Sequence, residues 1–345
     1  MRKVGRRRFL CVLAGTTAAA GIGAAQFQAG RANKQAGGTH PGQKLIRVQR
    51  TSWALGSNIS LTALHEDTSR AEAALDAAFD ELERVENLMS IYRTDSQLSR
   101  LNQEGFLHEP HPYLIEVLLA ARQMSERTGG AFDVTVQPLW ALYWHAAQRG
   151  EMPAAAEVQQ ARARIDWRRV EINRRAIRLR GQDTAITLNG IAQGFAADRV
   201  AATLRQHGIQ HALIDTGELG SVGANADGEQ WSVGIQHPRQ PDAFVAIAKL
   251  AGRCLATSGD YATKFSGDFR HHHLLDPRSG DSPSDLSSVS ITADTALAAD
   301  ALSTAVFVLG CEDGMQLIRE TPGTDAMLIT KEGRVRVTPG FPIDV

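Results

Sequence analysis

The chain has 345 residues, of which 43% are hydrophobic and 22% are charged, the balance of a folded globular protein rather than a disordered one. Its formal net charge is -1, so no overall field attracts nucleic acid or anionic lipid. We therefore expect no nucleic-acid partner, and the natural partner must be inferred from a specific site.

The first thirty residues differ from the rest. Three arginines at positions 6 to 8 precede Phe9-Leu10 and an uncharged run of small and apolar residues that ends near Ala25. This order is typical of an export signal, and Arg-Arg-x-Phe-Leu resembles the twin-arginine signal, although Gly5 replaces its usual Ser or Thr. We predict a twin-arginine-type signal and leader over residues 1–30 and a periplasmic location. An uncleaved signal anchor is the alternative.

The next elements are two strands and two helices. Residues 45–64 predict two strands around a turn-prone Gly-Ser-Asn. Ser69 and Glu72 predict a capping box at the start of a long helix. Apolar residues then recur at helical spacing and predict one buried stripe, which consists of Leu75, Phe79, Leu82 and Val85. A second helix is predicted over 112–127, ended by two glycines.

The rest of the chain mixes strands and helices without strict alternation. Residues 148–180 are charged and predict a solvated peripheral segment. A strand is expected at 185–188, followed by a turn and a helix that ends near Gly208. Further strands are expected at 211–215, 231–236, 244–250 and 289–292, with a helix at 296–309 and a hairpin at 326–337. This order favours the α+β class.

Residues 189–194 form a glycine-containing turn that opens a predicted helix. Glycine allows a ligand to approach the backbone closely, and a helix start offers unpaired N–H groups to a phosphate. The turn lacks the Gly-Lys-Ser/Thr of a Walker loop, and many ordinary turns share its composition. Gly217, Gly220 and Gly223 also follow a strand, but no helix is expected after them, so a dinucleotide-binding Rossmann motif is excluded.

Asp300 and Thr304 are four residues apart in an otherwise apolar helix, so their oxygens share one helix face. A buried carboxylate is costly unless it is paired or binds a metal, and oxygen ligands suit Mg²⁺. The alternative is that Thr304 bonds to its own helix and Asp300 makes a structural hydrogen bond. Spacing alone favours this alternative.

The third cluster is His271-His272-His273, followed by a predicted Asp276-Pro277-Arg278 turn. His273 precedes the fixed Asp276 by three residues and is a candidate general base. Adjacent histidines also suggest zinc, although spacing identifies no third ligand. For His271 and His272 we expect solvent exposure.

The two cysteines beyond the leader, Cys254 and Cys311, could pair in an oxidising compartment. We expect instead that they are two small buried hydrophobic residues.

In their order along the chain, six motifs resemble those of the ApbE family of FAD:protein FMN transferases, and the resemblance extends from about Leu55 to the C-terminus. The motifs are Met89–Asn102, Gly130–Thr135 with Pro138-Leu139, Asn189–Asp198, Thr257–Tyr261, His273 with Asp276-Pro277, and Ala299–Ala305. The resemblance implies a single α+β domain over residues 45–343, of T-fold-like type with mixed or antiparallel sheets and packed helices.

The resemblance also implies a reaction and its residues. FAD would be the donor, Mg²⁺ the cofactor and a protein threonine the acceptor, with AMP released. The metal would be held by the carbonyl of Ala192 with Asp300 and Thr304, and His273 and Asp276 would be catalytic. The residues that would line the FAD site are Leu55, Tyr92, Ala131, Phe132, Asp133, Asn189, Phe195 and Leu275.

Two positions depart from the family pattern, since Gln193 replaces a frequent Lys and Asn189 a frequent Asp. Loss of a cation beside a pyrophosphate leaves more charge neutralisation to Mg²⁺. The Gln form with a twin-arginine leader resembles the NosX-like branch. That branch implies an exported acceptor of nitrous-oxide respiration or a redox-pump flavoprotein, membrane-bound acceptors included. An FAD pyrophosphatase and a non-catalytic flavin-delivery protein are the alternatives.

Overall fold

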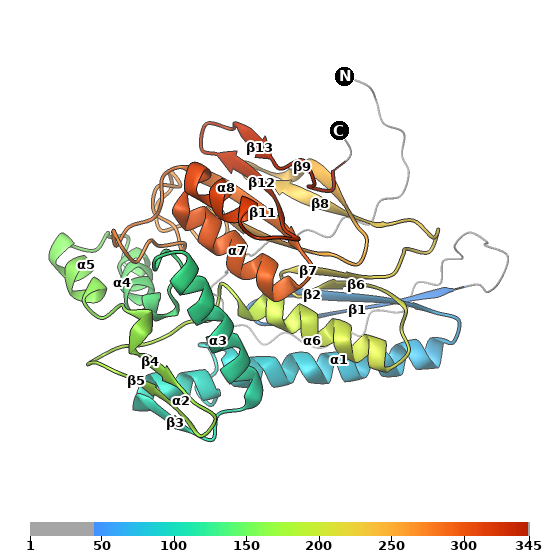
Figure 1. Cartoon of the computed structure of the whole chain (residues 1–345), viewed down its shortest axis with the longest axis horizontal. Coiled ribbons are helices and arrows are strands. Elements are labelled where there is room, and N and C mark those ends of the chain that lie inside the picture. The colour runs from blue at the N-terminus through green and yellow to red at the C-terminus, as the bar shows by residue number, and fades with distance from the viewer. Residues whose placement is uncertain (1–44, 344–345) are drawn as a thin grey trace.

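The computed structural model describes residues 45–343 and is built on an eight-stranded antiparallel sheet (Figure 1). The leader prediction lies outside the described residues. The sheet order is β1-β2-β6-β7-β10-β11-β12-β13. Its strands are β1 (Ile46–Ala54), β2 (Ser57–His65), β6 (His211–Asp215), β7 (Leu219–Val222), β10 (Cys254–Gly259), β11 (Leu286–Ala293), β12 (Asp325–Thr330) and β13 (Val335–Val337).

Three long helices cover one face of this sheet and enclose the main core. They are α1 (Thr68–Met89), α6 (Ala192–Gln206) and α7 (Ala296–Leu309). The predicted stripe of α1 is confirmed, because Leu75, Leu82 and Val85 are buried and Phe79 packs against the same core. Two further helices flank this layer, α3 (Pro112–Arg127) and α8 (Cys311–Arg319).

The opposite face of the sheet is covered by a hairpin of β8 (Trp231–His237) and β9 (Gln240–Leu250). Val233, Ile235 and Leu250 of this hairpin share a second core with Leu213 and Leu219 of the sheet. The sheet therefore has helices on one side and a hairpin on the other, and the expected α+β class is confirmed.

A smaller three-stranded sheet and a pair of helices complete the fold. The small sheet has the order β3-β5-β4, and its strands are β3 (Phe106–His108), β4 (Val170–Ile172) and β5 (Ala176–Leu179). The remaining helices are α2 (Gln97–Glu104), α4 (Gln137–Gln148) and α5 (Ala155–Arg162), with the 3-10 turns η1 (Val134–Val136) and η2 (Trp167–Arg169). Helices α4 and α5 extend to one side in Figure 1 and share a third core with Leu275.

Two local predictions were wrong. The cap of α1 is Asp67, whose carboxylate accepts from the backbone N–H of Ser69 and Arg70, so Ser69 lies inside the helix. Residues 185–188 belong to no strand or helix. Their backbone bonds go to the Asn102 side chain and to the Val134 carbonyl instead of a neighbouring strand.

Both described cysteines, Cys254 and Cys311, are buried and unpaired, as expected for small apolar residues. Over residues 45–343, no helix combines the length and the apolar character that crossing a membrane requires.

Candidate active site

The centre of the site is the crossing of α6 and α7. The backbone N–H of Gly194 donates to Asp300 Oδ2 at 2.9 Å. A Cβ on Gly194 would lie 2.2 Å from the Ala296 carbonyl oxygen, so only glycine permits this approach of the two helices. A Cβ on Gly190 would lie 2.9 Å from Thr304 Oγ1. Asp300 and Thr304 therefore both face the turn at 189–194, and Ala192 begins α6 within that turn.

Three acidic residues are buried around this crossing. Asp215, Glu218 and Asp300 are each less than a tenth exposed. Burial raises the pKa of the Asp300 and Glu218 carboxyl groups, and the charge of Asp300 raises the pKa of Glu218 further. Burial also raises the pKa of Asp215 to about 7. A cation beside these carboxyl groups would offset the cost of ionising them.

The donor set at the crossing fits a hard divalent cation. One oxygen of Asp300 is bonded to Gly194, and the hydroxyl of Thr304 lies one helical turn further along the same face. With a backbone carbonyl of the turn, these are the oxygen ligands that Mg²⁺ accepts while it keeps water and phosphate in its other positions.

Beside the turn, the β1–β2 connection forms one wall of the site. Leu55 and Gly56 have φ of 52° and 77°, which makes the connection tight. Gln193 Nε2 donates to the Leu55 carbonyl at 3.3 Å and to Ser57 Oγ at 3.2 Å. Gln193 thus makes two neutral bonds to this wall.

Tyr92 lies next to the same wall and leaves an aromatic ring accessible. Asn189 Nδ2 donates to the Tyr92 hydroxyl at 3.5 Å, and a Cβ on Gly56 would lie 4.0 Å from the Tyr92 ring. Tyr92 is 64% exposed, so its ring is accessible to a ligand. The structure therefore brings together Leu55, Tyr92 and Asn189 from three distant segments.

Residues 131–133, which belong to the second motif, are all buried. Asp133 Oδ1 accepts from the backbone N–H and hydroxyl of Thr135 at 2.8 and 2.6 Å, and Oδ2 accepts from the Trp167 N–H at 3.0 Å. Asp133 lines a cavity of about 380 Å³ together with Trp167, Pro277 and Arg278. This cavity joins the Gly-Ala-Phe-Asp segment to the predicted Asp-Pro-Arg turn.

His273 is held in a defined orientation by Thr263. Its backbone N–H donates to the Thr263 carbonyl at 3.0 Å, and its Nδ1 lies 3.3 Å from the same oxygen. Because a carbonyl only accepts, Nδ1 carries the proton and Nε2 keeps a lone pair. Burial lowers the pKa of His273 to about 4, so the ring is neutral near pH 7 and its Nε2 is unprotonated.

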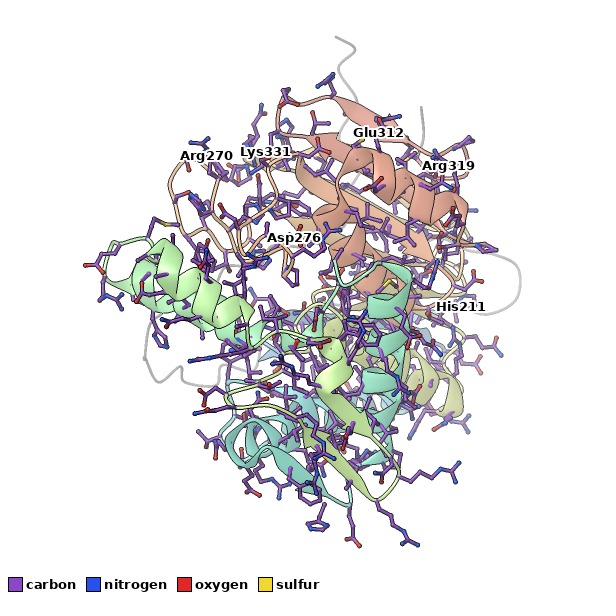
Figure 2. All side chains as sticks on the ribbon, turned by 60° about the vertical axis from the view of Figure 1, so that its left-hand side comes forward. His211, Arg270, Asp276, Glu312, Arg319 and Lys331 are labelled. Carbon is purple, nitrogen blue, oxygen red and sulfur yellow. The ribbon has the colours of Figure 1, made fainter. Side chains whose placement is uncertain are left out.

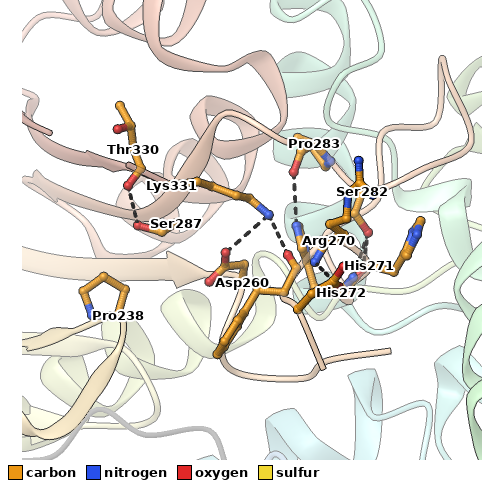
Figure 3. Close-up of polar contacts among 12 residues, drawn as sticks. Pro238, Asp260, Arg270, His271, His272, Ser282, Pro283, Ser287, Thr330 and Lys331 are labelled. Atoms are coloured by element: carbon orange, nitrogen blue, oxygen red, sulfur yellow. Dashed lines mark hydrogen bonds and ion pairs between the residues drawn. The ribbon is translucent and has the colours of Figure 1, made fainter. Parts of the chain in front are cut away.

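A buried ion network anchors the loop that carries His273 (Figure 3). Asp260 at the end of β10 is fully buried, and Arg239 donates two bonds of 2.7 Å to its carboxylate. Lys331 lies 3.4 Å from Asp260 and donates to the Phe269 carbonyl at 2.6 Å. Arg239, which lies over the Phe269 ring, and Lys331 thereby hold the loop at Phe269.

The other two histidines differ from the expectation of solvent exposure. His272 is wholly buried, with its ring edge on Phe307 and Nε2 3.2 Å from the Pro283 carbonyl, so this prediction was wrong. Burial lowers its pKa to about 3. His271 is half-buried and pairs with Asp281 at 2.8 Å. Within residues 45–343 no group of three His, Cys, Asp or Glu is arranged to hold a metal, so the zinc alternative gains no support.

The side chains of three other expected residues contact partners other than Asp300 and Thr304. Asp276, labelled in Figure 2, bonds twice to Arg278 at 2.9 Å, and the Nδ1 partner of His273 is Thr263 instead. Leu275 is buried in the core it shares with α4. Phe195 is 2% exposed, and its ring meets the edge of Tyr113 in the main core. The roles assigned to these residues stay predictions.

The profile of the ApbE family matches residues 55–328. The chain belongs to the ApbE family. It is 32% identical to the FAD:protein FMN transferase of Treponema pallidum over 297 residues, which cover 79% of this chain and 81% of the relative.

Solved ApbE structures have the same fold. The apo form of the Pseudomonas stutzeri flavinyl transferase ApbE matches with a TM-score of 0.76 at 31% identity, covering 87% of this chain and 97% of the other. The Vibrio cholerae flavin transferase ApbE matches with a TM-score of 0.75 at 26% identity, covering 86% and 98%. The ApbE resemblance read from the sequence is confirmed.

Two buried groups beside the α6–α7 crossing were missed by sequence reasoning. Glu218 follows a strand and accepts from the backbone N–H of Thr257 at 3.0 Å. Its sequence signal is an acidic residue between Gly217 and Gly220, within the segment that was excluded above as a Rossmann motif. Ser258 lies within a quoted motif without an assigned role, yet its hydroxyl reaches α7.

Proposed function

We propose that this protein is an FAD:protein FMN transferase that uses Mg²⁺ to attach FMN from FAD to a threonine hydroxyl of another protein. Asp300 and Thr304 of α7 facing the Gly194 turn of α6 carry the proposal, because they create an oxygen site beside a helix start. The family and the named activity of its relatives support the donor and the reaction class.

Mg²⁺ would be held by Asp300, Thr304 and the carbonyl of Ala192. When bound, the cation supplies charge neutralisation for the FAD phosphates and polarises phosphorus. The chain's own contribution is the geometry. Gly190 and Gly194 keep α6 and α7 close, and Tyr92 presents a ring on which the flavin or adenine of FAD can pack.

His273 would act as the general base. Its Nε2 takes the proton of the acceptor hydroxyl, whose oxygen forms a new bond to the FMN-side phosphorus as the bond to the AMP phosphate oxygen breaks. The products are a protein–FMN phosphoester and AMP, and the proton is left on His273. The Thr263 carbonyl stabilises the Nδ1–H throughout.

We also propose that the protein acts in the periplasm on an exported acceptor, soluble or membrane-bound. The support is the arginine-containing leader at the start of the sequence. Gln193 stands where the family frequently has lysine, and it makes two neutral bonds to the β1–β2 connection. Because Gln193 brings no positive charge, neutralisation of the FAD phosphates would depend more on the metal.

The test is incubation of the protein with FAD, Mg²⁺ and candidate periplasmic acceptors that carry a flavinylation-motif threonine. In-gel flavin fluorescence that requires the acceptor threonine, with release of AMP, is the expected result. Free FMN and AMP without covalent attachment would identify a pyrophosphatase instead. Bound, unchanged FAD under all conditions would identify a delivery protein.

A further inference from the structure

A chain of three hydroxyl groups links β10 to α7 behind the proposed cation site. Ser258 Oγ lies 2.8 Å from Ser303 Oγ and 3.3 Å from Thr304 Oγ1. Ser303 Oγ in turn donates to the Asp300 carbonyl at 2.9 Å. Ser258 is 9% exposed and Ser303 is wholly buried, so these hydroxyls depend on one another rather than on bulk water.

Counting hydrogens gives this chain a direction. Each hydroxyl has one proton to donate, and the Asp300 carbonyl only accepts. The Ser303 hydroxyl therefore donates its proton to that carbonyl and must accept a hydrogen bond from Ser258. Ser258 has then used its own proton and must accept from Thr304.

We propose that Ser258 is a positioning residue that draws the proton of Thr304 toward β10 and leaves the lone pairs of Thr304 Oγ1 for the cation. A threonine in a helix commonly bonds to the carbonyl four residues earlier, which for Thr304 is Asp300. That carbonyl accepts from Ser303, and within the helix it also accepts from the backbone N–H of Thr304, so both of its lone pairs are used. Ser258 is then the acceptor that keeps the Thr304 proton away from the side facing Gly190.

This inference rests on the proposed metal site, so the first measurement tests that site. Binding of Mn²⁺ alone to the full chain, without FAD, is followed by the loss of free-Mn²⁺ signal in electron paramagnetic resonance. Asp300→Asn should abolish tight binding. If Asp300→Asn bound Mn²⁺ as well as the wild type, the metal assignment itself would fail.

Ser258→Ala tests the positioning role. Groups that orient a metal ligand commonly contribute 10- to 100-fold in affinity, so we expect Mn²⁺ binding about 10-fold weaker. Ser290→Ala is the matched control, because Ser290 Oγ bonds Thr257 Oγ1 at 2.8 Å in the neighbouring strand pair, whereas the hydroxyl bonded to Thr304 is that of Ser258. The control should bind Mn²⁺ like the wild type, with thermal unfolding measured for both variants.

A double-mutant cycle separates positioning from a general structural effect. In a Thr304→Ala background, Ser258→Ala should cause no further loss, because Ser258 acts through the Thr304 hydroxyl. A Ser258→Ala protein that binds Mn²⁺ normally, while Asp300→Asn does not, would overturn the inference but leave the proposed function standing. A loss of about 10-fold that persists without Thr304 would also overturn it.

Discussion

Replacing Gly190 by alanine should displace the Thr304 hydroxyl while leaving the fold intact. The new Cβ would lie 2.9 Å from Thr304 Oγ1 and 3.2 Å from its Cγ2. Ordinary contacts are longer, so Thr304 must move by about 0.5 Å. A misplacement of about 1 Å at a catalytic centre costs about 100-fold in rate, and we expect a 10- to 100-fold fall in FMN transfer.

The free energy of unfolding should change little in Gly190→Ala. Crowding at one methyl group destabilises the folded state by about 1 kcal/mol. Alanine also makes the unfolded chain less flexible than glycine does, which stabilises the folded state by about 0.4–1 kcal/mol. Gly190 does not have the positive φ that would strain an alanine.

The assay for Gly190→Ala is the initial rate of acceptor labelling over a series of Mg²⁺ concentrations, with urea unfolding as the measure of stability. Gly267→Ala is the control, since its Cβ would meet no atom within 4 Å. An unchanged rate and Mg²⁺ dependence in a folded Gly190→Ala protein would refute the role of the Thr304 hydroxyl.

Three further predictions concern charge. Asp300→Asn should keep its bond from Gly194 and fold normally, but lower transfer about 1,000-fold in the labelling assay; a fully active variant would contradict the metal assignment. Because the folded pKa of Asp215 is raised to about 7, the native state binds its proton more tightly than the unfolded state does. As the pH rises from about 4 to about 7, this group should therefore lower the free energy of unfolding of the wild type by about 1.4 kcal/mol per pH unit. Urea unfolding should show that this slope is absent in Asp215→Asn. Lys331→Met should destabilise the protein by about 1–3 kcal/mol and lower kcat, because Asp260 and the Phe269 carbonyl each lose a partner. Arg334→Met, which removes only an exposed pair with Glu332, should do neither, and equal effects of the two variants would exclude a role for Lys331 in holding the loop.

Periodic elements were predictable from the sequence because burial repeats along them. The helix at 296–309 was predicted with its observed bounds, and the helical spacing of Asp300 and Thr304 placed both on one face. Spacing could not show which neighbour that face meets. The close contact with α6 depends on Gly194, whose missing Cβ is meaningful only once the two helices are placed together.

Long-range polar contacts were not predictable. His272 is buried because its ring contacts Phe307 of α7 and the Pro283 carbonyl. Both partners are far from His272 along the sequence. The partner of His273 is the Thr263 carbonyl, and a backbone group leaves no mark in the sequence. The apolar residues Ile186 and Leu188 predicted a strand at 185–188, and both are buried. The backbone of Ile186, however, bonds to the Asn102 side chain and not to a neighbouring strand.

The most direct test of the account is a crystal of the protein grown with Mn²⁺ and measured for anomalous scattering. The account predicts one strong peak bounded by Asp300, Thr304 and the Ala192 carbonyl, which disappears in crystals of Asp300→Asn. A protein that labels its acceptor while the peak lies elsewhere, or is absent at saturating Mn²⁺, would contradict it.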